Sequence, residues 1–168
     1  SYKVIKIGNR EWTTENLNVE HYRNGDPIPQ VQDKEEWENL TTGAWCYFEN
    51  KSENGTIYGK LYNGYAITDS RGIAPEGWHI PGDEEWTKLT DFLGGQEVAG
   101  EKMKSKSGWD ENGNGTNSSG FSGLPGGYRN HNGYFLNFGK NGLFWTSTEF
   151  SSSNLWFRNL IGSIPDVY

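Results

Sequence analysis

The sequence is poor in cysteine, in long apolar runs and in positive charge. Its 168 residues include one cysteine, Cys46, so no disulfide can form between two of these residues. No apolar run reaches the roughly 20 residues of a transmembrane helix, so we expect no membrane-spanning segment in this chain. The chain has 15 basic and 22 acidic residues, for a net charge of −7. A nucleic-acid partner is not expected, because a phosphate backbone repels such a chain.

Aromatic residues and glycine are abundant instead. Phe, Trp and Tyr make up 15% of the chain, and there are 23 glycines. Aromatic rings must therefore supply much of the buried apolar surface. The glycine content indicates turns and irregular loops rather than long helices. With a length that fits one domain, we expect a single α+β domain over residues 1–168.

Short periodic segments predict the regular elements. They indicate two hairpin strands at residues 4–7 and 10–12, and two helices at residues 34–40 and 83–93. Two core strands follow at residues 144–145 and 155–157, with a turn between them at residues 151–154. Gly8-Asn9 tolerates the positive φ of a hairpin turn, and Asp33 is a good helix N-cap.

The stretch WDENGNGTNSSGF, residues 109–121, contains the first half of an EF-hand pattern. Asp110, Asn112 and Asn114 place oxygen atoms at every second residue. The twelfth position is Phe121, where the pattern needs a bidentate Glu. Side chains that bond their own backbone in turns explain the same residues. We expect a turn-forming loop and no cofactor, and keep calcium as the alternative, with Asp110, Asn112 and Asn114 as its ligands.

A second loop, GGYRNHNGYF at residues 126–135, brings aromatic, amide and cationic side chains together. Rings that stack on sugar faces, with Asn and Arg bonding hydroxyl groups, would suit a carbohydrate. Core positions explain Tyr128 and Phe135 equally well. The expected ligand-binding residues are Arg129, Asn130, His131, Tyr134 and, from the preceding loop, Trp109.

Four longer stretches resemble a known family, the Fibrobacter succinogenes major paralogous domain, or FISUMP. They are "EWTTENLNVEHYRNGDPIP", "YGKLYNGYAITDSRGIAPEGWHIPGDEEWTKLTDFLGG", "SGFSGLPGGYRNHNGYF" and "FWTSTEF". The resemblance covers nearly the whole chain. It implies an exported or surface-anchored bacterial module, such as a lipoprotein, often found in Bacteroidetes-type genomes. The expected location is therefore secreted or on the outer cell surface.

A more distant resemblance bears on the fold. "GWHIPGDEEWTKL", residues 77–89, is similar to a helix of formylglycine-generating-enzyme-type domains, which have a C-type lectin-like fold. That fold implies a small twisted antiparallel sheet with two flanking helices, paired N- and C-terminal strands and long irregular loops that form the ligand face. The cysteines of those enzymes are not present here, so their chemistry is not expected.

The resemblance also implies that this FISUMP-type domain lacks its final C-terminal strand. The family pattern continues past the point where the chain stops at Asp166-Val167-Tyr168. The missing strand would carry the cysteine that is the candidate partner of Cys46. Its loss would leave an exposed edge beside the first strand, which favours pairing with a strand-donating partner.

Catalysis is not expected. The three histidines lie far apart in the sequence without metal-type spacing, and no Gly-x-Ser-x-Gly or phosphate-binding motif occurs. Cys46 alternates with aromatic neighbours as a buried strand residue does. We expect His79 to be a hydrogen-bonded core residue, and Trp145 and Glu149 to be structural. A hydrolase that uses Glu149 with Asp110 ranks third among the functional hypotheses.

The leading hypothesis is a non-catalytic binding module for carbohydrate. Its recognition face would be formed by the loops from about Trp109 to Asn141, together with residues 151–154. The alternative is a structural or adhesion domain that docks to a surface protein through an exposed sheet edge.

Overall fold

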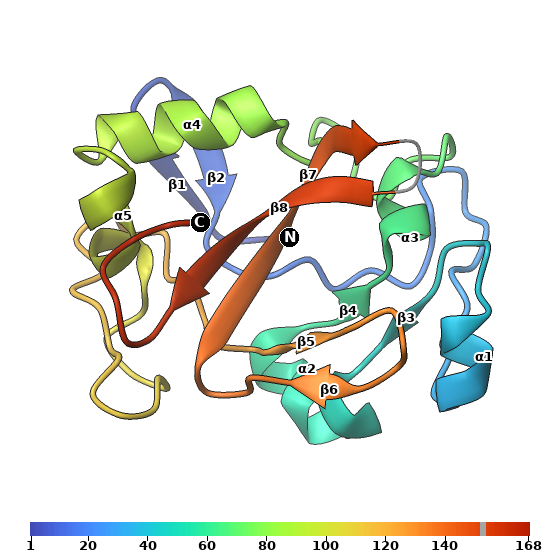
Figure 1. Ribbon diagram of the computed structural model, residues 1–168. Helices are drawn as coiled ribbons and strands as arrows, with labels where there is room; N and C mark the ends of the chain where they lie inside the picture. Colours follow the sequence, from blue (N-terminus) through green and yellow to red (C-terminus); the bar gives the residue numbers. More distant parts are fainter. Residues whose placement is uncertain (152–153) are drawn as a thin grey trace.

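A computed structural model describes residues 1–151 and 154–168, and it confirms the mixed α+β class (Figure 1). The strands of the described residues form four two-stranded sheets, each antiparallel. The longest hairpin, β7–β8, crosses the front of the molecule in Figure 1. Helix α4 lies above it, and α2, β5 and β6 lie below it.

The N-terminal hairpin agrees with the sequence prediction. Strand β1 (Val4–Ile7) pairs with β2 (Arg10–Thr13) around a turn in which Gly8 has a φ of 64°. Ile7 and Trp12 are buried, while their neighbours along the strands are more exposed. The hairpin thus uses one face to cover the core.

The segment after the hairpin holds a predicted helix and several short elements that the sequence pattern did not predict. Helix α1 (Lys34–Glu38) begins at Asp33, whose side chain accepts a bond from the Glu36 N–H, and Trp37 is its buried residue. The other elements are β3 (Trp45–Cys46), the 3-10 turn η1 (Phe48–Asn50), α2 (Ser52–Tyr58), β4 (Leu61–Tyr62) and α3 (Gly64–Thr68). Strands β3 and β4 pair with each other.

Two helices follow, of which one was predicted. Helix α4 (Asp83–Phe92) has acidic residues in its first turn, and the Glu85 carboxylate accepts the Gly82 N–H at 2.9 Å. Helix α5 (Gln96–Met103) was not predicted. It contains Gly100, where a Cβ would lie 2.3 Å from the carbonyl oxygen of Asp166. Contact with the C-terminal segment therefore requires a glycine at this position.

The last strands form two hairpins. β5 (Tyr128–Arg129) pairs with β6 (Phe135–Leu136), and β7 (Asn141–Ser151) pairs with β8 (Asn154–Ile161). The predicted late strands are confirmed as parts of β7 and β8. Phe157 is not a core residue, however, because 43% of its surface is exposed. Of the predicted turn over residues 151–154, residues 152 and 153 lie outside the described part of the chain.

The C-terminal segment pairs with β8 rather than with the first strand. Val167 bridges Leu160, and the backbones of Asn159 and Tyr168 exchange two hydrogen bonds. Among the described residues, β1 pairs with β2, so the expected pairing of N- and C-terminal strands stays a prediction. The Lys104 ammonium lies beneath this segment and donates to the carbonyls of Ile161, Gly162 and Ile164, at 2.9 to 3.1 Å.

Three buried clusters hold the elements together. The first joins β1–β2, α4, α5 and β8. The second lies around β3, β4 and α3, and the third around α1 and β3. The first cluster contains Ile7, Trp12, Trp86, Leu89, Leu93, Ala99, Met103, Trp109, Phe121, Leu160 and Val167. The second contains Tyr22, Ile28, Trp45, Tyr62, Ala66 and Ile73. The third contains Val31, Trp37, Ala44 and Cys46. Cys46 is fully buried, as expected.

Candidate functional site

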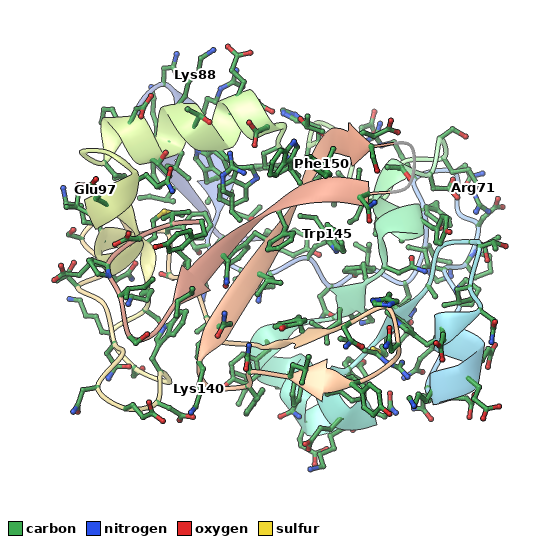
Figure 2. The ribbon with its side chains drawn as sticks, viewed as in Figure 1. Arg71, Lys88, Glu97, Lys140, Trp145 and Phe150 are labelled. Carbon is green, nitrogen blue, oxygen red and sulfur yellow. The ribbon has the colours of Figure 1, made fainter. Side chains whose placement is uncertain are left out.

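A cavity of about 870 Å³ lies between the β7–β8 hairpin and the layer formed by β4, α3 and β5. Trp145 of β7 lies in the middle of the molecule between these two parts (Figure 2). Its indole N–H donates to the Tyr62 carbonyl at 2.8 Å, so the ring is held in place across the cavity. The cavity brings together segments that are far apart in the sequence.

Aromatic rings line the cavity from several elements. Tyr58 ends α2, Tyr65 lies in α3, Tyr128 in β5 and Phe157 in β8. Tyr65 and Phe157 are 48% and 43% exposed, so their rings are accessible to a ligand. Burial raises the pKa of the Tyr58 hydroxyl, and the Asp110 carboxylate raises it further. This hydroxyl therefore stays protonated at neutral pH.

Amide side chains add hydrogen-bonding groups to the same cavity. Asn141 donates from Nδ2 to Oδ1 of Asn159 at 3.0 Å, and Asn130 accepts the Tyr134 N–H through Oδ1. Within the described residues, no bond uses the Nδ2 of Asn159 or of Asn130. Asn63 is different, because its amide bonds Thr42, Ala44 and Ala66 and so fixes the local backbone.

Three of the five residues predicted to bind ligand line the cavity, namely Arg129, Asn130 and His131. Arg129 also has a clear structural role. Its guanidinium donates to the carbonyls of Val31, Gln32, Asp33 and Gly133, at 2.8 to 3.2 Å. It lies 4.4 Å from the ring centroid of Trp37 and 4.8 Å from that of Phe135. Arg129 thus ties the β5–β6 hairpin to the segment before α1.

The other two predicted ligand-binding residues lie elsewhere. The Tyr134 hydroxyl bonds Lys34 at 2.8 Å, and the same ammonium lies 4.0 Å from the ring centroid. Trp109 belongs to the first buried cluster, and its indole N–H donates to the Ser105 hydroxyl and the Gly123 carbonyl. Trp109 is therefore a core residue rather than part of a surface. The glycine and asparagine around it had indicated an exposed loop.

The predicted calcium ligands form part of a tightly bonded turn. Asn114 Oδ1 accepts the Trp109 N–H at 3.1 Å, and the Gly113 N–H donates to the Asp110 carbonyl. Asn112 has a φ of 63°, a conformation that Asn tolerates in turns. Among the described residues, no group of three or more His, Cys, Asp or Glu side chains is placed to hold a metal ion.

The structural role expected for Glu149 stays a prediction: its side chain is exposed and lines the cavity, and Arg158 pairs with Asp83. His79 is hydrogen-bonded as expected, but it is exposed rather than in the core, with Nε2 2.9 Å from the Glu85 carboxylate. Partial burial raises the pKa of Glu85, but bonds from Gly82 and His79 outweigh this and lower it overall.

Tyr65 and Phe157 are two exposed cavity residues that the sequence analysis did not assign to a site. A weak signal was present for Phe157, because alternation along β8 places it on the same face as Leu155 and Asn159. Tyr65 had no such signal. It follows Asn63, the N-cap of a five-residue helix that has no clear apolar periodicity.

The fold and the cavity define an α+β module with an open, aromatic-lined site. Residues 5–164 match the family model described as the Fibrobacter succinogenes major domain, and the chain belongs to this family. The family resemblance seen in the sequence is thereby confirmed. No curated protein and no solved structure matches the chain. Over the described residues, no helix has the length and apolar character needed to cross a membrane.

Proposed function

We propose that this chain is a non-catalytic carbohydrate-binding module that is secreted or displayed on the cell surface. The observation that supports this most directly is the open cavity lined by both aromatic rings and amide side chains. Ring faces remove the apolar faces of a sugar from water, while amides exchange hydrogen bonds with its hydroxyl groups. The exposed rings of Tyr65 and Phe157 would supply the stacking surfaces.

The charges around the cavity favour a neutral glycan over an acidic one. Glu38 and Glu149 line the cavity and are exposed. Its cations are already engaged: Arg129 bonds four carbonyls, and Lys60 bonds Asn18 and lies 3.3 Å from Glu20. A uronate or sulfate group would therefore meet two carboxylates, while the guanidinium and the ammonium that could bind it already donate to other groups.

We also propose that the fold is C-type lectin-like. Support comes from the position of α4 directly after the GWHIPG segment, from the long β7–β8 hairpin and from the irregular connections around the cavity. The proposed location rests on the family resemblance described above.

Binding to a glycan array and calorimetric titration with the best neutral oligosaccharide would test the proposal. We expect measurable binding, and a loss of about tenfold or more in affinity in Tyr65→Ala and in Phe157→Ala, since each change removes a stacking surface. Phe150→Ala is the matched control. Phe150 is 64% exposed on the same hairpin but does not line the cavity.

Two results would contradict the proposal. One is the absence of binding to any neutral glycan, with or without added calcium. The other is equal loss of affinity in Phe150→Ala and Phe157→Ala, which would place the ligand at the tip of the hairpin. Hydrolysis of a polysaccharide that stops in Glu149→Gln would instead support an enzyme.

A further inference from the structure

Lys60, the residue before β4, is a buried lysine. Its side chain is only 3% exposed, whereas lysine side chains normally reach solvent unless they are paired. The Nζ atom lies 4.5 Å from the ring centroid of Trp45 and 5.2 Å from that of Tyr47. The two rings take the place of water around part of the amine, and the other contacts of Nζ determine its chemistry.

Two side chains of the segment at residues 17–20 contact this amine. Nζ of Lys60 donates to Oδ1 of Asn18 at 2.6 Å and lies 3.3 Å from Oε1 of Glu20. Since a C=O bond is about 1.2 Å long, Nζ lies about 3 to 4 Å from Cγ of Asn18. Atoms about to react are held about 3 to 3.5 Å apart. A primary amine, an amide carbon and a carboxylate therefore meet at one place.

The segment that carries the amide and the carboxylate is fixed by its own backbone bonds. The Tyr62 hydroxyl accepts the Val19 N–H and donates to the Val19 carbonyl, each at 2.7 Å. The Asn18 N–H donates to the Tyr2 hydroxyl at 2.9 Å. A Cβ at Gly59 would lie 3.1 Å from a carbonyl of this segment, so a glycine beside the lysine allows the close approach.

The Asn18 amide is held at its oxygen alone. Within the described part of the chain, no bond uses its Nδ2, so the amide can turn about Cβ–Cγ and present the face of its carbon to Nζ. The amide of Asn63 differs, because backbone bonds fix both its oxygen and its nitrogen. Asn18 and Glu20 are exposed, so a small molecule released between them passes directly into solvent.

We propose that Lys60 and Asn18 form an isopeptide bond, with Glu20 transferring the protons. The carboxylate takes one proton from the ammonium, and the freed electron pair of Nζ attacks Cγ. The Cγ–Nδ2 bond then breaks: Nδ2 keeps the electron pair, receives the proton from Glu20 and leaves as ammonia. Glu20 takes a second proton from Nζ and passes it to the ammonia. One ammonium ion is released, a Cγ–Nζ bond replaces the Cγ–Nδ2 bond, and no group is oxidised or reduced.

The bond closes a covalent loop over residues 18–60. It fastens the segment behind the N-terminal hairpin to β4, and it restricts the unfolded chain as a disulfide does. Cys46 is the single cysteine of the sequence, so no disulfide between two of its residues can serve this purpose. The inference goes beyond the proposed function, because the bond forms whether or not a glycan binds.

The mass of the parent chain, kept folded at neutral pH and then denatured, tests the proposal. We expect a mass lower than that of the sequence by one molecule of ammonia. Trypsin does not cleave after a lysine whose amine is bonded. It should therefore release a branched peptide in which residues 11–23 are joined to residues 52–71. Fragmentation of this peptide should place the branch between Asn18 and Lys60.

Three variants test the role of each group. Lys60→Arg keeps a cation beside Asn18 and Glu20 but cannot form the bond, and should have the full mass of its sequence. Glu20→Gln should lower the branched fraction by about tenfold or more in samples of equal age, because an amide does not take a proton from the ammonium. Glu15→Gln is the matched control. Glu15 pairs with Lys3 instead, and this variant should branch as the parent chain does.

Three results would overturn the proposal. A parent chain that keeps its full mass through long incubation would show that Lys60 is a buried cation and forms no bond. Loss of ammonia that maps to an asparagine followed by glycine would be ring closure with the next backbone nitrogen, which does not involve Lys60. An equal branched fraction in Glu20→Gln and in the parent chain would remove Glu20 from the reaction.

Discussion

The two sides of the cavity are stabilised in different ways. On the side of α4 and α5, the first buried cluster packs rings against rings and aliphatic side chains, as in the contacts of Trp86 with Trp12 and Phe121. On the side of β3, β4 and α1, rings also pack against rings, as Trp45 does against Tyr47, but cations lie over several of them. Lys60 is 4.5 Å from the centroid of Trp45, and Arg129 is 4.4 Å from that of Trp37.

This difference follows from composition and has a functional consequence. A chain short of aliphatic residues can bury rings against each other or beneath the stems of long cationic side chains. The second arrangement adds directional hydrogen bonds, because each buried cation must be satisfied by nearby oxygen atoms. It therefore holds the cavity-lining backbone at residues 129–131 in one position without a long strand or helix.

We call the side of α4 and α5 the first side, and the side of β3, β4 and α1 the second side. Removal of a central ring from the first side should have the largest effect on stability. Trp86→Ala would leave a cavity among Trp12, Phe121 and Phe144, and should lower the free energy of unfolding by about 3–5 kcal/mol. Urea denaturation measures this change. Phe92→Ala is the matched control on the same helix, since Phe92 is 65% exposed, and should change stability by less than about 1 kcal/mol. Equal losses in both variants would show that this cluster is not the main core.

The stability of the second side should depend on the hydrogen-bonding geometry of its cations rather than on side-chain volume. Arg129→Lys keeps the charge but cannot reach four carbonyl oxygens, and should cost about 2–3 kcal/mol of unfolding free energy. Arg10→Lys is the control, because Arg10 is itself exposed and lysine keeps the charge that pairs with Glu85, so stability should change by less than about 1 kcal/mol. If Arg129→Lys were as stable as the parent chain, the carbonyl contacts would not hold this side together.

The first side was also the easier one to predict from sequence. Gly8-Asn9 and the acidic first turn of α4 are local signals, and they located β1, β2 and α4. Helix α5 was missed because Gly100 weakens its local pattern. That glycine is explained only by the distant Asp166 carbonyl against which it packs.

The cavity could be predicted only in part, for the same reason. The composition of one loop indicated Arg129, Asn130 and His131, which do line it. Tyr65 and Phe157 come from a helix and a strand whose meeting with that loop depends on tertiary packing. Trp109 has glycine and asparagine neighbours, which are typical of exposed loops. The local sequence therefore does not predict that its side chain is buried.

A pH titration gives the finest test of how carboxylates hold the cations on the second side. Arg71 lies 4.0 Å from the ring centroid of Tyr22, and its guanidinium donates to both oxygens of Asp69. This bonding lowers the pKa of Asp69 from 3.8 to about 2. Because the folded-state pKa is the lower one, the contribution of the pair is complete above about pH 4 and is lost as pH falls through about 2.

The expected readout is the difference in melting temperature between the parent chain and Asp69→Asn. It should be positive and constant from about pH 7 to about pH 5, and should shrink toward zero as the pH approaches 2. We expect the smallest of the three effects here, because both groups lie near solvent, where water and salt screen the pair. A difference that stays constant down to pH 2 would mean that Asp69 acts through its shape and neutral hydrogen bonds. The cation over Tyr22 would then be held by ring packing and by its bond to Asp26, without a contribution from the charge of Asp69.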